Sequence, residues 1–387
     1  MRVLAISNVF GRPWEPIRGP YNQIIFNELA KRHEITVLVP VSFIDVLKHF
    51  VAYCYVYRAT RLKWPYARYF IYWYIPGVSQ SVNALFMFFS VAVACPRIVF
   101  QKKWDVMFGS WLYPDCVVAN WVGRLRGIPS ISHAIGSDVN IVAFKPLQSR
   151  QITKFLNGCY RVLTVSADLG LKLAKIGIHK PRLEVVYNGV DSDVFRPITQ
   201  AEVRAKLGLP LDAKIITFVG SLFREKGCIE LVTSFARLAP TKNNLLLVFV
   251  GQGGMLDQLK SEARSLGVYE RVHFIGRVMH ADLGPWFAAS DLTALPSYNE
   301  GVPNVIMESM SCGVPVVASD VGGIPEVLPD FAGIMVPAKN VTALTEALKQ
   351  AMARKWNSDD IRRHAGTYTW KNTVDQIESI MKDAIRS

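Results

Sequence analysis

The sequence lacks the cysteine pattern of a disulfide framework or of a structural metal site. Its six cysteines include no C-x-x-C pair, and none lies near a histidine at the spacing of zinc ligands. Charged residues are also scarce, at 19% of the 387 residues, whereas half of the residues are hydrophobic. We therefore expect a reducing compartment, no metal ion, and a folded chain with a large apolar core.

Long hydrophobic runs are missing as well. The strongest run, residues 84–95, has 12 residues and stops at Pro96 and Arg97, whereas a membrane-spanning helix needs about 20. We expect a buried or interfacial helix there. The N-terminal residues 1–8 carry one basic residue and too short an apolar stretch for a signal peptide, so they predict a first β-strand.

Acidic residues are absent between Val46 and Trp104, in a chain whose formal net charge is +13. Residues 1–190 carry +14 and residues 191–387 carry −1, so the excess lies in the first half. The acid-free stretch combines basic and aromatic side chains, which is typical of a membrane interface. They are Lys48, Arg58, Arg61, Lys63, Arg68, Arg97, Lys102 and Lys103 with Phe50, Tyr53, Tyr55, Tyr57, Trp64, Tyr66, Tyr69, Phe70, Tyr72, Trp73 and Tyr74.

Two other interpretations of this stretch stay open: an irregular core segment with a solvated basic rim, and a nucleic-acid surface. The nucleic-acid interpretation is the weakest, because no RRM, KH or helix-turn-helix signature accompanies the charge. We therefore predict an anionic membrane surface as a partner, and no nucleic acid.

Elsewhere the sequence alternates short apolar runs with helical patterns, which predicts parallel sheets covered by helices on both faces. The pattern restarts after the turn-rich segment 188–197. We predict an α/β chain of two doubly wound, Rossmann-like domains facing across a cleft. Their limits are 1–190, with a basic-aromatic insertion at about 43–104, then 191–370, and a C-terminal helix at 371–387 that can pack back on the first domain.

The most informative segment holds two glutamates, Glu300 and Glu308, separated by seven residues. Pro303 fits the first turn of a helix, where its missing N–H costs nothing. Glu300 would then lie on the loop after a strand, and Glu308 about one turn into the helix. The amides of Gly301, Val302 and Asn304 would gather at the helix N-terminus, which is an anion site. Carboxylates on both sides of such a site suit a nucleotide sugar.

This spacing and its flanking segments resemble the E-x7-E signature of glycosyltransferase family 4, whose members are retaining enzymes of the GT-B fold. The resemblance covers residues 160–340 almost continuously and the first domain more loosely. The matching segments are Tyr187–Asp191, Val219–Gly227, Gly251–Gly254, Glu300–Glu308, Val321–Glu326, Gly19 and Ser132–Asp138.

The resemblance implies roles for residues of the second domain. Glu308 would bind the nucleotide ribose, and Glu300 would contact the hydroxyls of the donor sugar. Lys226 would hold the diphosphate, which leaves with growing negative charge. Gly220, Gly301, Val302 and Asn304 would complete the donor-binding set together with Gly19 of the first domain.

In the first domain, the resemblance places Gly19 close to donor and acceptor, and His133 near the transferred sugar. The alternative for His133 is a core histidine with satisfied hydrogen bonds. We interpret Asp138 as a loop or helix-cap residue rather than a catalytic acid. Asp191 and Asp193 lie two apart after Asn-Gly, which indicates a turn rather than a metal motif.

One position departs from the family pattern. Family members usually have an arginine directly after the glycine of the sixth-strand loop, whereas this chain has Ser221 after Gly220. We predict that Arg224 supplies the missing charge beside Lys226.

Together these residues predict a metal-independent, retaining hexosyltransferase that needs no cofactor and takes its sugar from a nucleoside-diphosphate sugar. The resemblance favours a front-face route, because no nucleophile is evident for the anomeric carbon. The basic-aromatic stretch adds a lipid-linked or cell-envelope glycan as acceptor, hence polysaccharide biosynthesis by a cytoplasmic protein bound peripherally to the inner face of the cell membrane. The alternatives are a sugar-nucleotide epimerase or phosphorylase of the same fold, and a non-catalytic scaffold that binds glycan or membrane.

Overall fold

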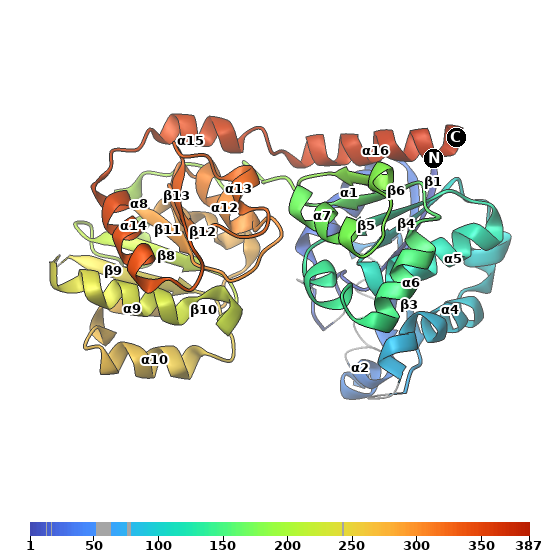
Figure 1. The fold of residues 1–387 in the computed structure, drawn as a ribbon, viewed down its shortest axis with the longest axis horizontal. Coiled ribbons are helices and arrows are strands. Elements are labelled where there is room, and N and C mark those ends of the chain that lie inside the picture. The colour runs from blue at the N-terminus through green and yellow to red at the C-terminus, as the bar shows by residue number, and fades with distance from the viewer. Residues whose placement is uncertain (13, 17, 52–62, 76–78, 242–243) are drawn as a thin grey trace. The chain divides into compact units, whose positions relative to one another are not determined.

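The computed structural model describes residues 1–12, 14–16, 18–51, 63–75, 79–241 and 244–387. The described chain forms two compact units, each with a parallel sheet and helices around it (Figure 1). The first unit is Met1–Tyr187 with Trp370–Ser387, and the second is Asn188–Thr369. These limits lie within three residues of the predicted ones, and the C-terminal helix belongs to the first unit.

The first unit has a seven-stranded sheet in the order β3-β2-β1-β4-β5-β6-β7, with every neighbouring pair parallel. Its strands are β1 (Arg2–Ser7), β2 (Glu34–Ser42), β3 (Ala67–Tyr72), β4 (Val106–Ser110), β5 (Ser130–Ala134), β6 (Arg161–Thr164) and β7 (Leu183–Val185). Its helices are α1 (Pro20–Arg32), α2 (Phe43–Lys48), α4 (Asn83–Ala94), α5 (Val117–Arg126), α6 (Pro146–Leu156), α7 (Ala167–Lys175) and α16 (Trp370–Arg386). Short helical turns are η1 (Ser79–Val82), η2 (Arg97–Gln101), η3 (Leu112–Cys116), η4 (Asp138–Val142) and η5 (Lys180–Arg182).

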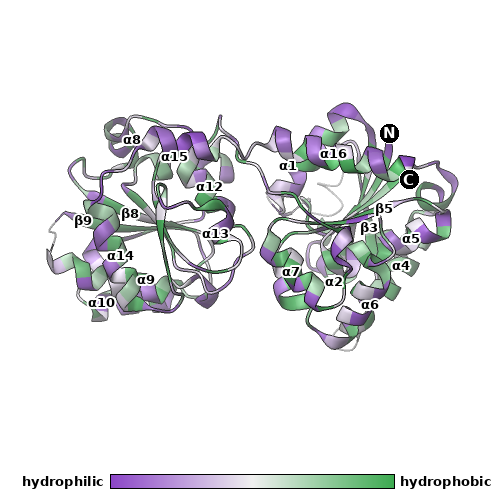
Figure 2. Ribbon diagram, turned by 45° about the horizontal axis from the view of Figure 1, so that its top comes forward, coloured by the Kyte–Doolittle hydropathy of each residue, from purple (hydrophilic) through white to green (hydrophobic). Residues whose placement is uncertain are grey.

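Both faces of this sheet are buried, as the continuous apolar strands predict. Successive side chains of β1 alternate between two cores: Val3 and Ala5 face one, and Leu4 and Ile6 face the other. Residues of α1 and α16 fill the first core, and residues of α4, α5, α6 and α7 fill the second. In Figure 2 the central strands of each unit are mainly green, and the surrounding helices carry both colours.

The predicted insertion at 43–104 is largely part of the sheet domain instead. β3 pairs in parallel with β2 and forms the sheet edge, while α2 and α4 both pack on β3. The predicted run at 84–95 is the helix α4, half buried. The side chains of Tyr53, Tyr55, Tyr57, Arg58 and Arg61, which contributed to the basic-aromatic prediction, lie outside the described residues. Within the part of the chain that the structure describes, no helix is both long and apolar enough to cross a membrane.

The second unit has a six-stranded parallel sheet in the order β10-β9-β8-β11-β12-β13. Its strands are β8 (Lys214–Val219), β9 (Leu245–Val250), β10 (Val272–Gly276), β11 (Leu292–Leu295), β12 (Val316–Ser319) and β13 (Gly333–Val336). Its helices are α8 (Gln200–Leu207), α9 (Cys228–Leu238), α10 (Leu256–Ser265), α11 (Gly284–Ala288), α12 (Asn304–Ser311), α13 (Ile324–Val327), α14 (Val341–Ala353) and α15 (Ser358–Ala365). Short turns are η6 (Arg224–Lys226), η7 (Ala239–Thr241), η8 (Tyr269–Arg271) and η9 (His280–Asp282).

Candidate functional site

The strand order of the second unit indicates where its candidate site lies. The chain winds outward in one direction from β8 through β9 to β10 and in the other from β11 to β13. Loops that follow β8 and β11 therefore diverge, and such a switch point opens a crevice at the carboxyl ends of the strands. Gly220 and Lys226 come from the loop after β8, and Glu300 comes from the loop after β11.

Lys226 and Glu300 meet in an ion pair at this edge of the sheet. The Lys226 ammonium lies 2.5 Å from Glu300 Oε1, and the carboxylate side chain is only 11% exposed. The two loops are also joined through the backbone, since the Tyr298 amide donates to the Glu225 carbonyl at 2.7 Å. Gly227 permits this approach: its φ is +67°, and a Cβ there would stand 2.0 Å from the Pro296 carbonyl oxygen.

The N-terminus of α12 lies beside this pair in the chain. The helix begins at Asn304, and Pro303 is its N-cap with an extended conformation, so the predicted place of Pro303 in the first turn is wrong by one position. The Asn304 side chain accepts a hydrogen bond from Asn188 Nδ2 at 3.1 Å, and the Gly301 carbonyl accepts one from the Gly323 amide at 2.7 Å. These bonds hold the loop so that the amides of the first helical turn form the positive end of the helix dipole.

Glu308 lies one turn into α12 and is 3% exposed. Its Oε1 is 2.8 Å from Nε2 of His280, which sits on η9 and packs its ring edge against Phe195 at 5.2 Å between ring centroids. Burial lowers the pKa of His280, but the hydrogen bond and charge of Glu308, with the charge of Asp191, outweigh it and the pKa is raised. No sequence motif marks His280, because only the tertiary structure brings it to Glu308.

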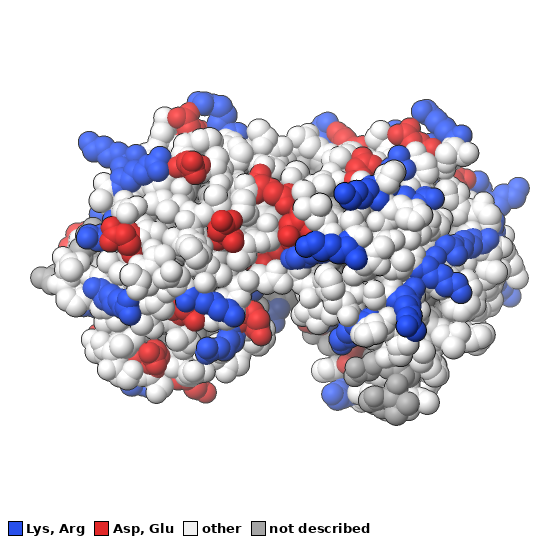
Figure 3. Space-filling model, viewed as in Figure 1, with Lys and Arg blue, Asp and Glu red and all other residues white. Residues whose placement is uncertain are grey.

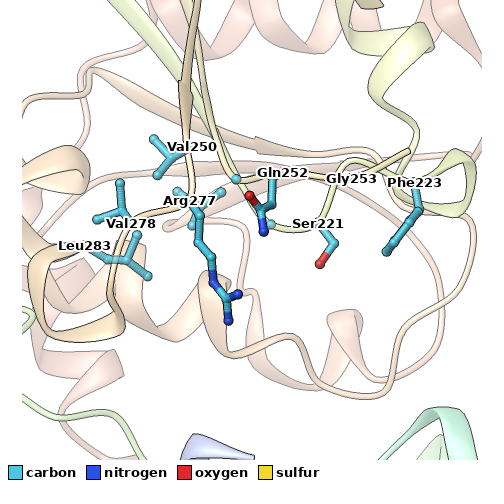
Figure 4. Close-up of a pocket in the computed structure, with 11 residues that line it drawn as sticks. Ser221, Phe223, Val250, Gln252, Gly253, Arg277, Val278 and Leu283 are labelled. Carbon is cyan, nitrogen blue, oxygen red and sulfur yellow. The ribbon is translucent and has the colours of Figure 1, made fainter. Parts of the chain in front are cut away.

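A pocket of about 440 Å³ opens beside these loops at the carboxyl ends of β8, β9 and β10. In Figure 4 the apolar side chains of Val250, Val278 and Leu283 lie on one side of the Arg277 guanidinium, and the polar Gln252 and Ser221 lie on the other. The lining residues are Val219, Gly220, Ser221, Phe223, Val250, Gly251, Gln252, Gly253, Arg277, Val278 and Leu283.

Arg277 is therefore the guanidinium of this pocket, and the sequence prediction missed it. Arg224, which we expected to replace the missing family arginine, lies exposed on η6 and is not among the described residues that line the pocket. It stays on the same loop as Lys226, and its charge lowers the pKa of the nearby Tyr298, whose pKa burial raises to about 12 overall.

The two site residues that we predicted in the first unit, Gly19 and His133, lie at the start of a helix and near the end of a strand. Gly19 is the N-cap of α1 with φ +61°, and a Cβ there would lie 2.3 Å from the Val9 carbonyl oxygen. His133 ends β5 and is 1% exposed; its Nδ1 lies 3.4 Å from Ser110 Oγ, which in turn donates to Asn22 Oδ1. Burial lowers the pKa of His133 to about 4, so the imidazole is neutral at pH 7. The predicted role of His133 near the transferred sugar and the alternative of a core histidine both stay predictions.

The carboxylates of Asp138 and Asp191 both accept hydrogen bonds from backbone amides. Asp138 is buried and accepts hydrogen bonds from the amides of Leu112 at 3.0 Å and Gly136 at 2.8 Å. Asp191 accepts from the amide of Asp193 at 3.0 Å, which is the turn chemistry that we predicted. Among the residues that the structure describes, no group of three or more His, Cys, Asp or Glu side chains is placed to hold a metal ion.

A second pocket, of about 610 Å³, lies in the first unit at the carboxyl ends of β1, β2, β3 and β4. Arg12 pairs there with Asp45 at 2.9 Å, and Trp14 stacks on His49 with ring centroids 5.1 Å apart. Trp111 reaches the pocket from a backbone with φ +91°, a rare conformation for a bulky residue. The lining residues are Asn8, Arg12, Trp14, Glu15, Arg18, Ser42, Asp45, His49, Tyr72, Tyr74 and Trp111.

Comparison with known proteins relates both units to sugar-transferring enzymes. Residues 199–382 match the family described as "Glycosyl transferases group 1", and residues 23–194 match "Glycosyltransferase Family 4". Curated relatives named D-inositol 3-phosphate glycosyltransferase, from Mycobacterium tuberculosis and Mycobacterium bovis, are 34% identical over 220 residues, which is 54% of this chain and 45% of each relative. The match thus spans less than half of those relatives.

Solved structures resemble nearly the whole chain. A sucrose-phosphate synthase from Thermosynechococcus elongatus is 18% identical with a TM-score of 0.76, over 99% of this chain and 98% of that one. HepE from Anabaena in complex with UDP-glucose is 19% identical with a TM-score of 0.73, over 99% of this chain and 100% of that one. At these identities the likeness shows a shared fold alone.

Proposed function

Because the chain belongs to glycosyltransferase family 4 and has the GT-B fold, we propose that it transfers a hexose from a nucleoside-diphosphate sugar to an acceptor hydroxyl, with retention of configuration and without a metal. The observation that carries this proposal is the Lys226–Glu300 ion pair at the switch point of the second unit. A fixed cation, a carboxylate and a helix N-terminus together suit the diphosphate and the sugar of such a donor.

In the proposed donor complex, the diphosphate binds between the Lys226 ammonium and the first-turn amides of α12. An ammonium has three donor hydrogens, so Lys226 can hold Glu300 and phosphate oxygens at once. Glu300 then accepts from hydroxyls of the sugar, and Glu308 accepts from the ribose. When the sugar–phosphate bond breaks, negative charge grows on the leaving phosphate, and the same cation and amides stabilise it.

The 440 Å³ pocket is the proposed place of the nucleobase. Its apolar wall, from Val250, Val278 and Leu283, can cover one part of a flat base, while Gln252 offers both a donor and an acceptor to the base edge. HepE is described in complexes with UDP and with UDP-glucose, so UDP and UDP-glucose are the first ligands to try here.

Binding and turnover of such ligands test the donor assignment. Calorimetry with UDP should give saturable binding, and Glu308→Ala should weaken it about 10- to 150-fold, because one hydrogen bond to a charged group is worth about 1.5–3 kcal/mol. Unchanged UDP affinity in that variant would remove Glu308 from the ribose site. Release of UDP only when an acceptor is added would separate a transferase from an epimerase, and no turnover with any donor would favour a binding scaffold.

The 610 Å³ pocket of the first unit is the proposed acceptor site. Aromatic faces from Trp14, Tyr72 and Trp111, next to the paired charges of Arg12 and Asp45, are the surroundings in which sugar rings bind: the rings stack and the hydroxyls meet charged hydrogen-bonding groups. The curated relatives are named for D-inositol 3-phosphate, so that polyol phosphate belongs in the acceptor panel beside lipid-linked glycans.

We further propose that the acceptor comes from a membrane, to which the first unit binds peripherally on the cytoplasmic side. Helix α4 exposes Leu85, Phe89 and Val93, spaced four residues apart and 41%, 59% and 80% exposed, so they line one side of the helix. Helix α5 packs on α4, and α6 packs on α5. Both are basic, and Figure 3 shows blue side chains running across them. We call this surface the basic-apolar face; it comprises Leu85, Phe89, Val93, Arg97, Lys103, Arg124, Leu125, Arg150 and Lys154.

Vesicle flotation tests this membrane proposal. The wild-type chain should float with vesicles that contain anionic lipid at low salt, and a Phe89→Ser/Val93→Ser variant should bind more than 10-fold more weakly, since each buried side chain contributes about 1.5–3 kcal/mol. The matched control is Leu211→Ser, which removes an equally exposed apolar side chain from the second unit. Equal flotation of wild type and double variant would contradict the proposed face.

A further inference from the structure

The buried Glu308 carboxylate pairs with a histidine from a different element. His280 lies on η9, 28 residues before Glu308 in the chain, and its Nε2 is 2.8 Å from Glu308 Oε1. Phe195 contacts the imidazole edge from the segment that leads into the second unit. The imidazole is thus fixed between an aromatic ring and a carboxylate, while its side chain keeps 28% of its surface exposed.

The hydrogen bond between His280 and Glu308 bears on the orientation of the carboxylate plane. A carboxylate can accept about four hydrogen bonds in its plane, so a donor bound to Oε1 fixes that plane without using up the group. Because Glu308 is 3% exposed, water cannot supply the same orientation from all sides. A hydroxyl-bearing ligand that reaches Glu308 then meets acceptor positions set in advance, which saves the cost of ordering them on binding.

The charge of His280 follows from its surroundings. Glu308 on α12 and Asp191 on the entry segment favour the imidazolium, against the burial that disfavours it. Asp282 lies on η9 itself. Cys312 is the C-cap of α12, and burial raises the pKa of its thiol to about 12, so that thiol stays neutral. The helix α11, which packs on η9, carries no titratable side chain. An imidazolium gives a charge-assisted hydrogen bond to the carboxylate, stronger than that of the neutral ring.

We propose that His280 is a positioning residue that holds the Glu308 carboxylate in the orientation that receives the ribose hydroxyls of the donor. This inference rests on the proposed donor site, and it adds a residue that the E-x7-E spacing does not contain. It makes nucleotide affinity depend on the protonation of His280: binding is strongest below the pKa of His280 and weakens as the pH rises through it.

The test compares nucleotide affinity in three proteins. The tightest-binding of UDP, GDP and ADP for the wild-type chain serves as probe, and its Kd is measured by calorimetry from pH 5.5 to pH 9. We expect His280→Ala to raise the Kd about 10-fold at pH 6. His280→Gln keeps an N–H donor that does not titrate, so it should stay within about threefold of wild type at pH 6 and lose the extra pH dependence. The titration of the nucleotide phosphate is common to all three proteins and cancels in the ratios.

Two further measurements separate orientation from loss of folding. In turnover assays, His280→Ala should raise the donor KM and leave kcat at saturating donor almost unchanged, because ribose binding is shared by ground and transition states. In NMR titrations, Glu308→Gln should lower the pKa of His280, since the charge of Glu308 and its charged hydrogen bond then no longer oppose the effect of burial. The matched control is His179→Ala, which removes an exposed histidine of the first unit and should change neither Kd nor KM.

The outcomes are distinguishable. Wild-type affinity in His280→Ala, or an equal loss in His280→Gln and His280→Ala, would overturn the positioning role while leaving the donor site intact. A wild-type chain that binds none of the three nucleotides would overturn the proposed function and this role with it. A His280 pKa that does not move in Glu308→Gln would overturn the pairing itself.

Discussion

At the scale of single residues, the contact between Lys226 and Glu300 joins two roles that the sequence treats separately. The ammonium is assigned to the diphosphate and the carboxylate to the donor sugar, yet the two groups form an ion pair at 2.5 Å. UDP contains the diphosphate but lacks the transferred sugar, whereas UDP-glucose contains both. The two residues should therefore respond differently to these ligands.

We predict that Lys226→Ala weakens UDP binding about 10- to 150-fold, because it removes a charged donor to the phosphates. Glu300→Gln should leave UDP affinity within about threefold of wild type and should lower turnover of the sugar donor at least 10-fold. Calorimetry with UDP and a coupled assay of UDP release measure the two effects. Equal loss of UDP affinity in both variants would contradict the separate roles.

The buried Asp115 leads to a second prediction for a single residue, which concerns how stability depends on pH. It is fully buried and accepts hydrogen bonds from the Asn8 amide at 2.6 Å and from Asn8 Nδ2 at 3.3 Å. Burial nevertheless raises its pKa to about 8. Between its ordinary pKa and about 8, the folded chain therefore holds a proton that the unfolded chain has released, and stability falls as the pH rises, by at most about 1.4 kcal/mol per pH unit.

Asp115→Asn removes this titration and keeps an oxygen that accepts from Asn8. Its melting temperature, relative to wild type, should rise between pH 5 and pH 8, as differential scanning calorimetry can record. Asp359→Asn, at a 79% exposed side chain of the second unit, should show no such trend. Parallel melting curves for wild type and Asp115→Asn at both pH values would show that Asp115 is ionised in the folded chain.

Spacing along the chain reveals some site residues and hides others. Glu300 and Glu308 lie within one loop and one helical turn, so the sequence could place both. His280 and Arg277 come from the end of β10, and only the parallel sheet brings that loop to α12 and to the pocket. His133 lies near the end of β5, as expected, and its neutral, buried ring fits both interpretations that the short motif left open.

At the scale of elements, predictions succeeded where one face is apolar and failed where the pattern is weak. The long α16 has buried residues at helical spacing and was found from the sequence. The helix α8 buries only Val203 and Arg204, so its eight residues show no apolar stripe. The edge strand β3 interrupts its apolar residues with Arg68, and its aromatic neighbours made it look like part of an insertion.

The helix α16 also carries a prediction about stability. Val374, Ile377 and Met381 are fully buried in the core that α1 covers, and Trp370 stacks on Tyr21 at 5.9 Å between ring centroids. Ile377→Ala should therefore destabilise the first unit by about 2–5 kcal/mol through lost contacts and a cavity. UDP binding at low temperature should stay unchanged, because every proposed donor contact except Gly19 lies in the second unit.

Urea unfolding followed by tryptophan fluorescence and calorimetry with UDP measure these two quantities. The control on the same helix is Lys371→Ala, whose side chain is exposed and pairs only at the surface with Asp375, so no measurable change in unfolding is expected. A large loss of UDP affinity in Ile377→Ala would show that α16 supports the donor site as well.

At the scale of the whole molecule, charge is divided between the units. Moving α16 to the first unit adds as many basic as acidic residues, so the net charges stay at +14 and −1. The proposed donor site relies on single placed cations, whereas the proposed membrane attachment relies on many together. Each basic residue near an anionic surface contributes about 1 kcal/mol, and salt screens that attraction.

Salt should therefore separate the two activities. Raising NaCl from about 0.05 M to about 0.5 M should abolish flotation with anionic vesicles, because the Debye length shrinks to a few ångströms. UDP affinity over the same range should fall by less than about fivefold, since close contacts with few charges are screened less. Flotation and calorimetry in matched buffers provide the measurements, and vesicle binding that persists at high salt would point to the apolar side chains alone.

The pairing of Val190 with Thr369 shows that the chain enters and leaves the second unit through neighbouring segments. During synthesis, residues 1–187 emerge first, but one core of their sheet, which α1 covers in part, stays incomplete until α16 follows about 180 residues later. The second unit is continuous, so all of its residues are made before α16 begins. The part of the protein that is made first is thus completed last, and a chain that ended before Trp370 would leave the first unit with an incomplete, aggregation-prone core.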